Sequence, residues 1–171
     1  LSLVFIGALA AILAGFFYVQ GAKIIFLNKM VERFKHRNPN LFIEKTDSPD
    51  EVLKLIRKGE HEKLEFKATL RTNLHTNQHD KNIEHSILKT IAAFLNSEGG
   101  TLLIGVSDVG EIHGIEKDNF PSPDKFNLHF TNLVKEYIGN QNLPYLHFEL
   151  ITLENKNILK VDCMKAQKPV F

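Results

Sequence analysis

The sequence predicts an α+β domain in which one mixed sheet packs against helices. Three observations lead to this class. Residues 64–69 alternate between apolar and polar side chains, as in a half-buried strand. Residues 82–95 repeat apolar side chains at helical spacing. Residues 145–153 and 158–164 are two apolar runs on either side of a turn-rich quartet, as expected for a final pair of strands.

Composition agrees with a single globular domain. The chain has 171 residues, of which 43% are hydrophobic and 24% are charged, so it is long enough to form a core. Its one cysteine, Cys163, excludes an intramolecular disulfide and any Cys-x-x-Cys zinc site. A buried place in a strand is the expectation for this side chain.

Residues 1–22 are apolar and uncharged, with Ser2 and Gln20 as the polar side chains. As a helix they would reach about 33 Å at about 1.5 Å per residue, enough to cross a hydrocarbon core of about 30 Å. The positive charges follow this stretch, so the positive-inside rule places the C-terminal domain in the cytoplasm. We therefore expect a single-pass transmembrane helix. The alternative, a helix buried in a globular core, would need more surrounding protein than this chain provides.

Residues 23–47 are expected to form a basic juxtamembrane helix and a linker. Residues 23–37 carry five basic side chains against the single acid Glu32, and these cations would face lipid phosphates. Asn38-Pro39-Asn40 then breaks the helix. The membrane is therefore an expected partner, and residues 48–171 are expected to be the folded domain.

This domain should open with a helix and a strand–helix–strand unit. Ser48-Pro49-Asp50-Glu51 has the pattern of a capping box, and the helix should end near Gly59. The strand at 64–69 follows, then a loop at 70–80 and a helix over about 82–95 that ends at Gly99 or Gly100. A strand at 101–106 completes the unit.

The second half should contain a hairpin, one helix and two strands. The strand at 101–106 turns at Asp108 into a hairpin that reaches Ile115. Ser122-Pro123-Asp124 starts a helix that Gly139 ends. The two last strands follow, and we expect the domain to be truncated after Phe171, which would leave a sheet edge exposed.

Two motifs carry the functional prediction. Residues 59–67 read GEHEKLEFK, and residues 91–116 read IAAFLNSEGGTLLIGVSDVGEIHGIE. Glu60, Glu65 and Asp108 could meet at one end of the sheet. A glutamate, a second glutamate five residues on within Glu-Phe-Lys, a Phe-x-Asn-x-x-Gly-Gly segment and a Gly-Val-x-Asp turn recur in this order in the AlbA_2 domain of the Schlafen family. The chain resembles this family over about residues 50–170, and the resemblance implies an Alba-like fold.

The resemblance also implies two activities. Related domains bind DNA or RNA, and the ribonuclease branch cleaves tRNA-like substrates with two glutamates and an aspartate, which map onto Glu60, Glu65 and Asp108. Such carboxylates would hold Mg²⁺ or Mn²⁺. Two departures count against cleavage. Ser107 replaces the first acid of an Asp-Asp turn, and the ribonuclease branch builds its cleft from two modules, so a homo-oligomer would have to supply the second.

The first interpretation is therefore a membrane-tethered nucleic-acid-binding module, and the nuclease is the alternative. The binding candidates are cations and one amide near the motifs: Lys67, Arg71, Lys81, Lys89 and Asn96. A third interpretation is a protein-docking module. It is supported by the charge of residues 38–171, where acidic side chains outnumber basic ones although the whole chain has a net charge of +1.

Each acid also has an ordinary structural explanation. Glu60 is a solvated charge after a helix end, Glu65 lies on the polar side of an edge strand, and Asp108 is chosen for a turn. Lys67 could pair with Glu65, and Asn96 could cap a helix. These explanations and the functional ones predict different contacts for the same side chains.

Overall fold

The computed structural model describes residues 15, 18, 20–30, 33 and 48–170. The chain divides into two compact units, residues Leu1–Ile43 and Glu44–Phe171. The described residues of the first unit are helical, and residues 20–30 are their continuous part. The second unit contains the sheet and every candidate site residue.

The predicted transmembrane helix is not supported. Most of residues 1–22 lie outside the described part of the chain, and no helix within the described part is long and apolar enough to cross a membrane. Residues 20–30 would extend over about 16 Å, about half of a hydrocarbon core. They also include Lys23 and Lys29. The expected single-pass membrane location and the membrane partner are therefore corrected. Of the predicted juxtamembrane helix and linker at 23–47, residues 31–32 and 34–47 lie outside the described residues.

The second unit begins with the helix α2, Pro49–Lys58, and the strand β1, Leu64–Lys67. After them come the short strands β2, Thr72–Asn73, and β3, Gln78–His79, the long helix α3, Lys81–Asn96, and the strand β4, Gly100–Ile104. The second half consists of the 3₁₀ helix η2 (Ile115–Asp118), α4 (Pro123–Leu133), the π-helical turn η3 (Val134–Ile138), the 3₁₀ helix η4 (Asn140–Tyr145), β5 (Leu146–Leu153) and β6 (Lys156–Cys163).

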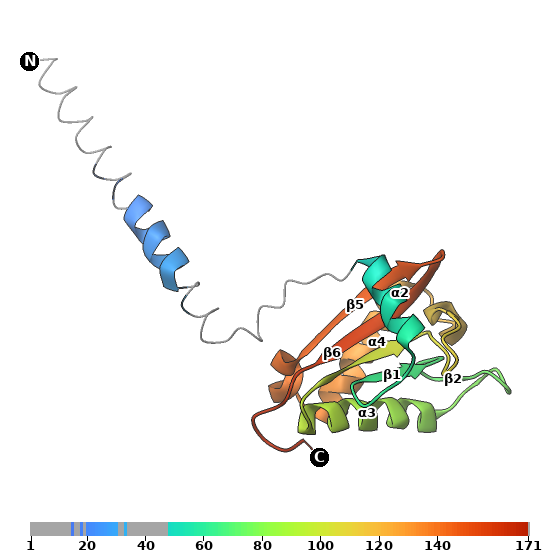
Figure 1. Cartoon of the computed structure of the whole chain (residues 1–171). Coiled ribbons are helices and arrows are strands. Elements are labelled where there is room, and N and C mark those ends of the chain that lie inside the picture. Colours follow the sequence, from blue (N-terminus) through green and yellow to red (C-terminus); the bar gives the residue numbers. More distant parts are fainter. Residues whose placement is uncertain (1–14, 16–17, 19, 31–32, 34–47, 171) are drawn as a thin grey trace, which may run out of the picture. The chain divides into compact units, whose positions relative to one another are not determined.

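One four-stranded mixed sheet organises the domain, in the order β1-β4-β6-β5 (Figure 1). The strands β1 and β4 are parallel, and Glu65 lies opposite Leu102. The pairs β4–β6 and β5–β6 are antiparallel. A parallel pair needs a crossover, which α3 supplies after β1. This arrangement confirms the predicted α+β class with a mixed sheet packed against helices.

Local sequence signals explain where the helices begin. The Ser48 hydroxyl accepts a hydrogen bond from Glu51 N at 3.3 Å, and the Glu51 carboxylate accepts one from Ser48 N at 3.1 Å. This is the predicted capping box. The carboxylate of Asp80 caps α3 by accepting from Asn82 N at 2.9 Å, and Ser122 caps α4 in the same manner. The helix starts are thus set by side chains within one turn of each helix.

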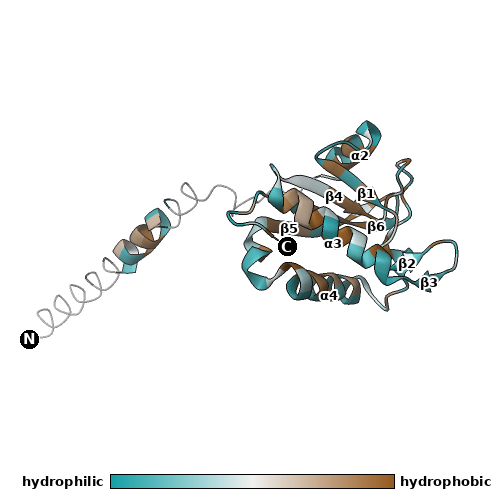
Figure 2. Ribbon diagram, turned by 90° about the horizontal axis from the view of Figure 1, so that it is seen from below, coloured by the Kyte–Doolittle hydropathy of each residue, from teal (hydrophilic) through white to brown (hydrophobic). Residues whose placement is uncertain are grey.

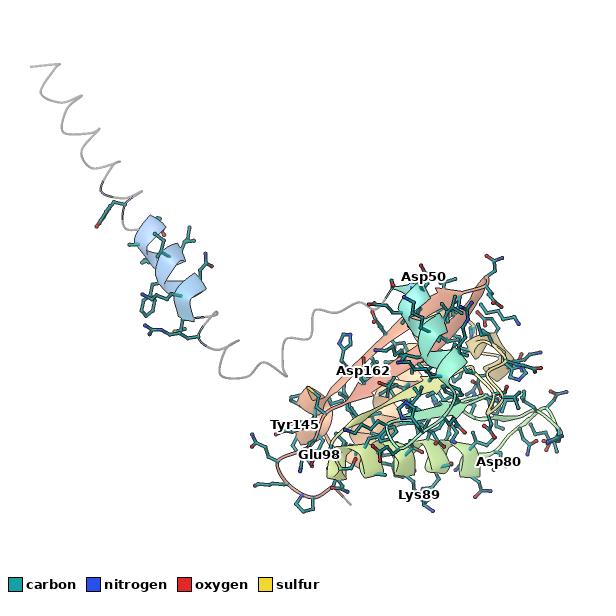
Figure 3. All side chains as sticks on the ribbon, viewed as in Figure 1. Asp50, Asp80, Lys89, Glu98, Tyr145 and Asp162 are labelled. Atoms are coloured by element: carbon teal, nitrogen blue, oxygen red, sulfur yellow. The ribbon has the colours of Figure 1, made fainter. Side chains whose placement is uncertain are left out.

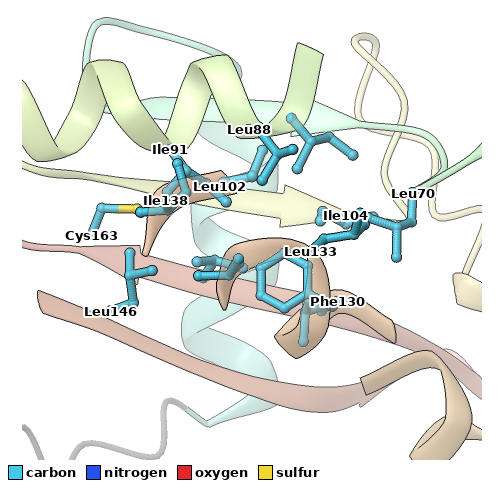
Figure 4. Packing of buried hydrophobic residues seen from close by; sticks show 14 of the residues in the cluster. Leu70, Leu88, Ile91, Leu102, Ile104, Phe130, Leu133, Ile138, Leu146 and Cys163 are labelled. Carbon is cyan, nitrogen blue, oxygen red and sulfur yellow. The ribbon is translucent and has the colours of Figure 1, made fainter. Parts of the chain in front are cut away.

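The sheet separates two apolar layers. Figure 2 shows α2 on one side of the sheet and α3 with α4 on the other. The α2 layer packs Val52 and Ile56 against Phe66 and Leu103 of the sheet. The opposite layer is the larger one, and in Figure 4 Ile91 and Phe130 come from its helices while Leu102 comes from β4. Alternate residues of each strand enter different layers, as the pleat requires.

Cys163 ends β6 within the larger layer and is 5% exposed. Burial raises the pKa of its thiol well above the ordinary value, and the Asp162 carboxylate acts in the same direction. The reactive species is the thiolate, so the native thiol should be inert. We expect a maleimide to label Cys163 orders of magnitude more slowly in the native chain than in urea, as followed by mass spectrometry. Labelling at equal rates would show that the layer opens readily.

Three segments differ from the sequence prediction. The predicted loop at 70–80 contains the two-residue strands β2 and β3. The predicted hairpin after β4 is reduced to a single bridge between Val106 and Ile112. The predicted helix that ends at Gly139 is α-helical only to Leu133, after which the chain widens into a π-helical turn. In each case the difference lies in backbone hydrogen bonds that the side-chain pattern did not predict.

Candidate nucleic-acid interface

Glu60 lies just after α2 and closes the outer edge of β1. Its Oε1 accepts a hydrogen bond from Phe66 N at 2.7 Å. The turn before β1 is closed by His61 N donating to Leu64 O and Leu64 N donating to His61 O, both at 2.9 Å. Because β4 occupies the other side of β1, these bonds satisfy amide groups that point outward. The structure therefore gives Glu60 the role of an edge cap.

Glu65 lies on the β1 face that looks toward α3, and its carboxylate is paired with Lys67. The Lys67 ammonium contacts Glu65 Oε1 and also donates to Phe66 O at 3.1 Å. The Glu65 side chain is 36% exposed and the Lys67 side chain is 22% exposed. The pairing of Lys67 with Glu65 is the structural explanation that the sequence offered for Lys67, and it engages Glu65 as well. Lys67 is thus a partly neutralised cation, which weakens its attraction for phosphate.

Asp108 lies at the tip of an exposed turn beyond the carboxyl end of β4. Ser107 holds this turn: its N donates to Glu111 O at 2.9 Å, its O accepts from Gly110 N at 2.8 Å, and its hydroxyl accepts from Glu111 N at 3.1 Å. The neighbouring Val109 is 83% exposed. The serine that departs from the family's acidic pair therefore acts as a turn residue.

The structure gives two members of the predicted acidic trio other partners. One oxygen of Glu60 is used by a backbone amide, and Glu65 is paired with a lysine, so both carboxylates already have partners. Within the described residues there is no group of three His, Cys, Asp or Glu side chains close enough together to hold an ion. Mg²⁺ and Mn²⁺ need several converging oxygens, so binding of either ion by these three residues stays a prediction.

The structure reveals one buried acid that the sequence analysis did not select. Asp118 is fully buried, and its carboxylate accepts from the amides of Leu70 at 2.7 Å, Arg71 at 2.8 Å and Thr72 at 2.9 Å. The Arg71 guanidinium donates to Asp118 O at 3.2 Å and lies over the Phe120 ring, 3.5 Å from its centre. The predicted phosphate contact Arg71 is therefore engaged within the domain.

Asn96 is likewise used by the chain itself. Its amide Nδ2 donates to Val170 O at 2.7 Å, and its Oδ1 accepts from Val170 N at 2.8 Å. This pair of bonds imitates a strand pairing and holds the C-terminal segment against the end of α3. The sequence offered a helix cap as the structural explanation of Asn96. The observed contact instead joins residues 74 positions apart.

Two predicted cations remain without an ion pair among the described residues, and both lie on α3. Lys81 and Lys89 are exposed, with His85 midway between them at the spacing i, i+4, i+8. We call these three residues the α3 basic stripe. Figure 3 shows Lys89 on the outer side of α3, pointing away from the sheet. His85 was not among the predicted binding residues, although its helical spacing from the two lysines could have indicated it.

The one acid of α3 is paired with a residue of α4. Glu84 accepts from His129 Nε2 of α4 at 2.7 Å, and its side chain is 17% exposed. Beside it lies a groove of about 440 Å³ between α3 and the helical segment of residues 133–137. The groove is lined in part by Lys81, His85 and Tyr137, which is 54% exposed, and also by the two acids Glu84 and Glu136. A cationic helix face thus adjoins an accessible aromatic side chain.

The fold and this surface define a class of protein: a mixed-sheet α+β domain with a basic stripe on its crossover helix. A family model, Schlafen AlbA_2, matches residues 60–171, which is more than half of the chain. The chain belongs to the Schlafen AlbA_2 family. The resemblance expected from the Glu-Phe-Lys and Gly-Gly motifs is thus confirmed for the domain.

Among solved structures, the chain is similar to the DIP2311 protein from Corynebacterium diphtheriae, with 14% identity and a TM-score of 0.49. This likeness covers 71% of the chain, which spans 22% of the length of that protein. It is also similar to the N-terminal domain of an ATP-dependent DNA helicase RecG-related protein from Nitrosomonas europaea, with 18% identity, a TM-score of 0.44, and coverage of 74% and 80% of the two chains. No curated protein matches the chain.

Proposed function

We propose that the domain is a nucleic-acid-binding module that contacts the phosphate backbone through the α3 basic stripe. The observation that carries this proposal is the separation of charge on α3: Lys81, His85 and Lys89 are exposed, while Glu84 is held by α4. Membership of the Schlafen AlbA_2 family supports the same function. The binding face is narrower than the sequence suggested, because Lys67, Arg71 and Asn96 serve the fold.

The geometry of the stripe suits a phosphate backbone. Lys89 lies eight positions after Lys81, so the stripe extends over about 12 Å at about 1.5 Å per residue. One strand of a duplex offers a phosphate about every 3.4 Å along its axis, so both lysines can contact the same strand. Contacts of this kind fix position without reading bases, and we expect little sequence preference.

The groove beside the stripe favours unpaired nucleotides. An exposed aromatic ring next to cations is the arrangement by which single strands are held without sequence readout, since every base has a face that can stack. Tyr137 lies within reach of the same ligand as Lys81 and His85 because all three line one groove. Single-stranded RNA or DNA is therefore the preferred ligand class of the proposal.

Replacing both lysines, Lys81→Ala with Lys89→Ala, should weaken binding and reduce its dependence on salt. Loss of two phosphate contacts lowers the slope of log affinity against log salt by about 1.4 for a single strand and by about 1.8 for a duplex. Fluorescence anisotropy with labelled oligonucleotides from low to physiological salt measures both quantities.

The matched control is Lys54→Ala with Lys58→Ala. These lysines are exposed on α2, which covers the opposite side of the sheet, and their removal lowers the net charge by the same amount. We expect this control to retain the wild-type slope. Equal losses for the two double variants would show that bulk charge, and not the α3 basic stripe, attracts the nucleic acid.

A further inference from the structure

The two edge strands of the sheet, β1 and β5, differ in whether their outward backbone groups have hydrogen-bond partners. The outward amides of β1 are closed by the Glu60 carboxylate and by the turn at His61. The strand β5 forms the other edge and is twice as long, with eight residues against four. Its sequence, LHFELITL, contains no lysine or proline, the residues that usually protect an edge from pairing. An open edge of this length is a template for another strand.

The register of β5 and β6 shows which backbone groups are free. Met164 N donates to Tyr145 O at 2.8 Å, so hydrogen bonds to β6 recur at every second residue from Tyr145. On the outward side of β5, the Leu146 amide donates to Leu143 O of the preceding turn. The Leu146 carbonyl and the amides and carbonyls of Phe148, Leu150 and Thr152 point away from β6. Within the described residues, no partner lies against these groups.

Two polar side chains near this edge each contain one atom without a hydrogen-bond partner. His147 Nε2 and Glu149 Oε1 are shielded from solvent, and neither atom has a partner among the described residues. Both side chains lie on the α2 face of β5, opposite Asp162 and Lys160 of β6. Shielding a polar atom without a hydrogen bond costs about 1–3 kcal/mol, so the pair is a signal for a missing partner.

We propose that β5 pairs with β5 of a second copy of this chain, antiparallel and about a two-fold axis at Phe148. In this register the Leu146 carbonyl faces the Leu150 amide of the other copy, and Phe148 faces itself. His147 of each copy then lies opposite Glu149 of the other copy, so the interface contains this pair twice. The two unpartnered groups are an acid and a base of complementary chemistry, which is the pairing that cross-strand neighbours favour.

Neighbouring registers are less favourable. An axis at Glu149 would set two carboxylates directly opposite each other, and like charges in that place are destabilising. An axis at Leu150 would place Glu149 opposite Ile151. The axis at Phe148 also ends the ladder naturally, because Thr152 then faces Pro144, which has no N–H to donate. The inference is independent of the proposed function, because it rests on β5 alone.

The test uses cysteines that report this register. In the full chain, His147→Cys together with Glu149→Cys places a thiol of each copy opposite one of the other, at a Cα separation of about 4.5 Å, within the range for a disulfide. Mild oxidation should join the double variant into a species with the mass of two chains on a non-reducing gel. The single variants His147→Cys and Glu149→Cys are matched controls and should stay uncrosslinked, because each new thiol faces a non-cysteine residue.

Sedimentation of the wild-type chain gives the second readout, and we expect a dimer at micromolar concentrations. Circular dichroism checks that each cysteine variant is folded. A wild-type chain that stays monomeric at high micromolar concentration would overturn the proposal. Single variants that crosslink as well as the double variant would overturn the register. Cys163 does not interfere, because it is buried in the layer on the other face of the sheet.

Discussion

Replacing Asp118 with alanine should lower the free energy of unfolding by about 3–5 kcal/mol, because three amides would lose a shared acceptor in the interior. The carboxylate receives hydrogen bonds from Leu70, Arg71 and Thr72, which lie 46–48 residues earlier in the chain. The side chain is fully buried, so water cannot take its place. Urea unfolding monitored by circular dichroism measures the change.

Two further variants make this prediction specific. Asp118→Asn retains one acceptor oxygen, so we expect it to lose only part of the stability that Asp118→Ala loses. Asp124→Ala removes an exposed carboxylate in the first turn of α4, and its effect should be small. Equal stability of Asp118→Ala and Asp124→Ala would contradict the role of Asp118 as the anchor of the β1–β2 loop.

Replacing Gly99 with alanine should destabilise the domain by about 2–5 kcal/mol, from backbone strain and a clash together. Gly99 has φ of +83°, and an added Cβ would lie 2.5 Å from Cys163 O. That oxygen belongs to the end of β6, so it cannot move aside as the tip of a flexible side chain could. Thermal and urea unfolding of the variant measure the cost.

Gly59→Ala is the control for strain alone. Gly59 has φ of +76°, a φ value close to that of Gly99, but nothing lies within 4 Å of the added Cβ. Its loss of stability should therefore come from backbone strain alone, about 1–3 kcal/mol, and be less than that of Gly99→Ala. Similar losses for the two variants would show that the close approach of β6 to the Gly-Gly turn contributes nothing.

These two anchors matter for the binding face as well. Asp118 fixes the segment that follows β1, and Gly99 fixes the turn that follows α3. The helix between them carries Lys81 and Lys89. A variant that loosens either anchor should therefore weaken nucleic-acid binding together with stability, whereas the lysine variants should weaken binding with stability unchanged.

Much of the fold could be predicted because its signals are local. The capping box at Ser48 and the apolar spacing of Ile87 and Ile91 each lie within a few residues, and α3 ends within one residue of its predicted terminus. The pair β5 and β6 was recognised from its turn, where Glu154 and Asn155 adopt positive φ. Local backbone chemistry thus determined these elements.

The contacts that could not be predicted join residues far apart in sequence. Asp118 binds amides in a loop that precedes it by nearly fifty residues, and Asn96 binds Val170. Nothing in the residues around Asp118 distinguishes a buried acid from an exposed one. The same limit applies to the site: sequence proximity to the motifs suggested Arg71 and Asn96 as ligands, but longer-range contacts of the fold engage both side chains.

The membrane prediction failed for a different reason. It relied on the length and hydropathy of residues 1–22 and on the basic residues that follow them, but in the described part of the chain no helix has the length and apolar character to cross a membrane. The described features of the folded unit lie outside this stretch. Its two apolar layers, its capped β1 edge and its basic helix all lie within residues 48–170.

The most direct test of the central claim is a titration of the full chain with labelled single-stranded RNA, single-stranded DNA and duplex, in EDTA and in Mn²⁺, read for both binding and cleavage. We predict binding that falls steeply with salt, survives EDTA and leaves the ligand intact. Cleavage that requires metal and is abolished by Glu65→Ala would contradict the account and make the acidic trio catalytic. Neither binding nor cleavage at low salt would contradict it equally, and would favour a protein-docking domain.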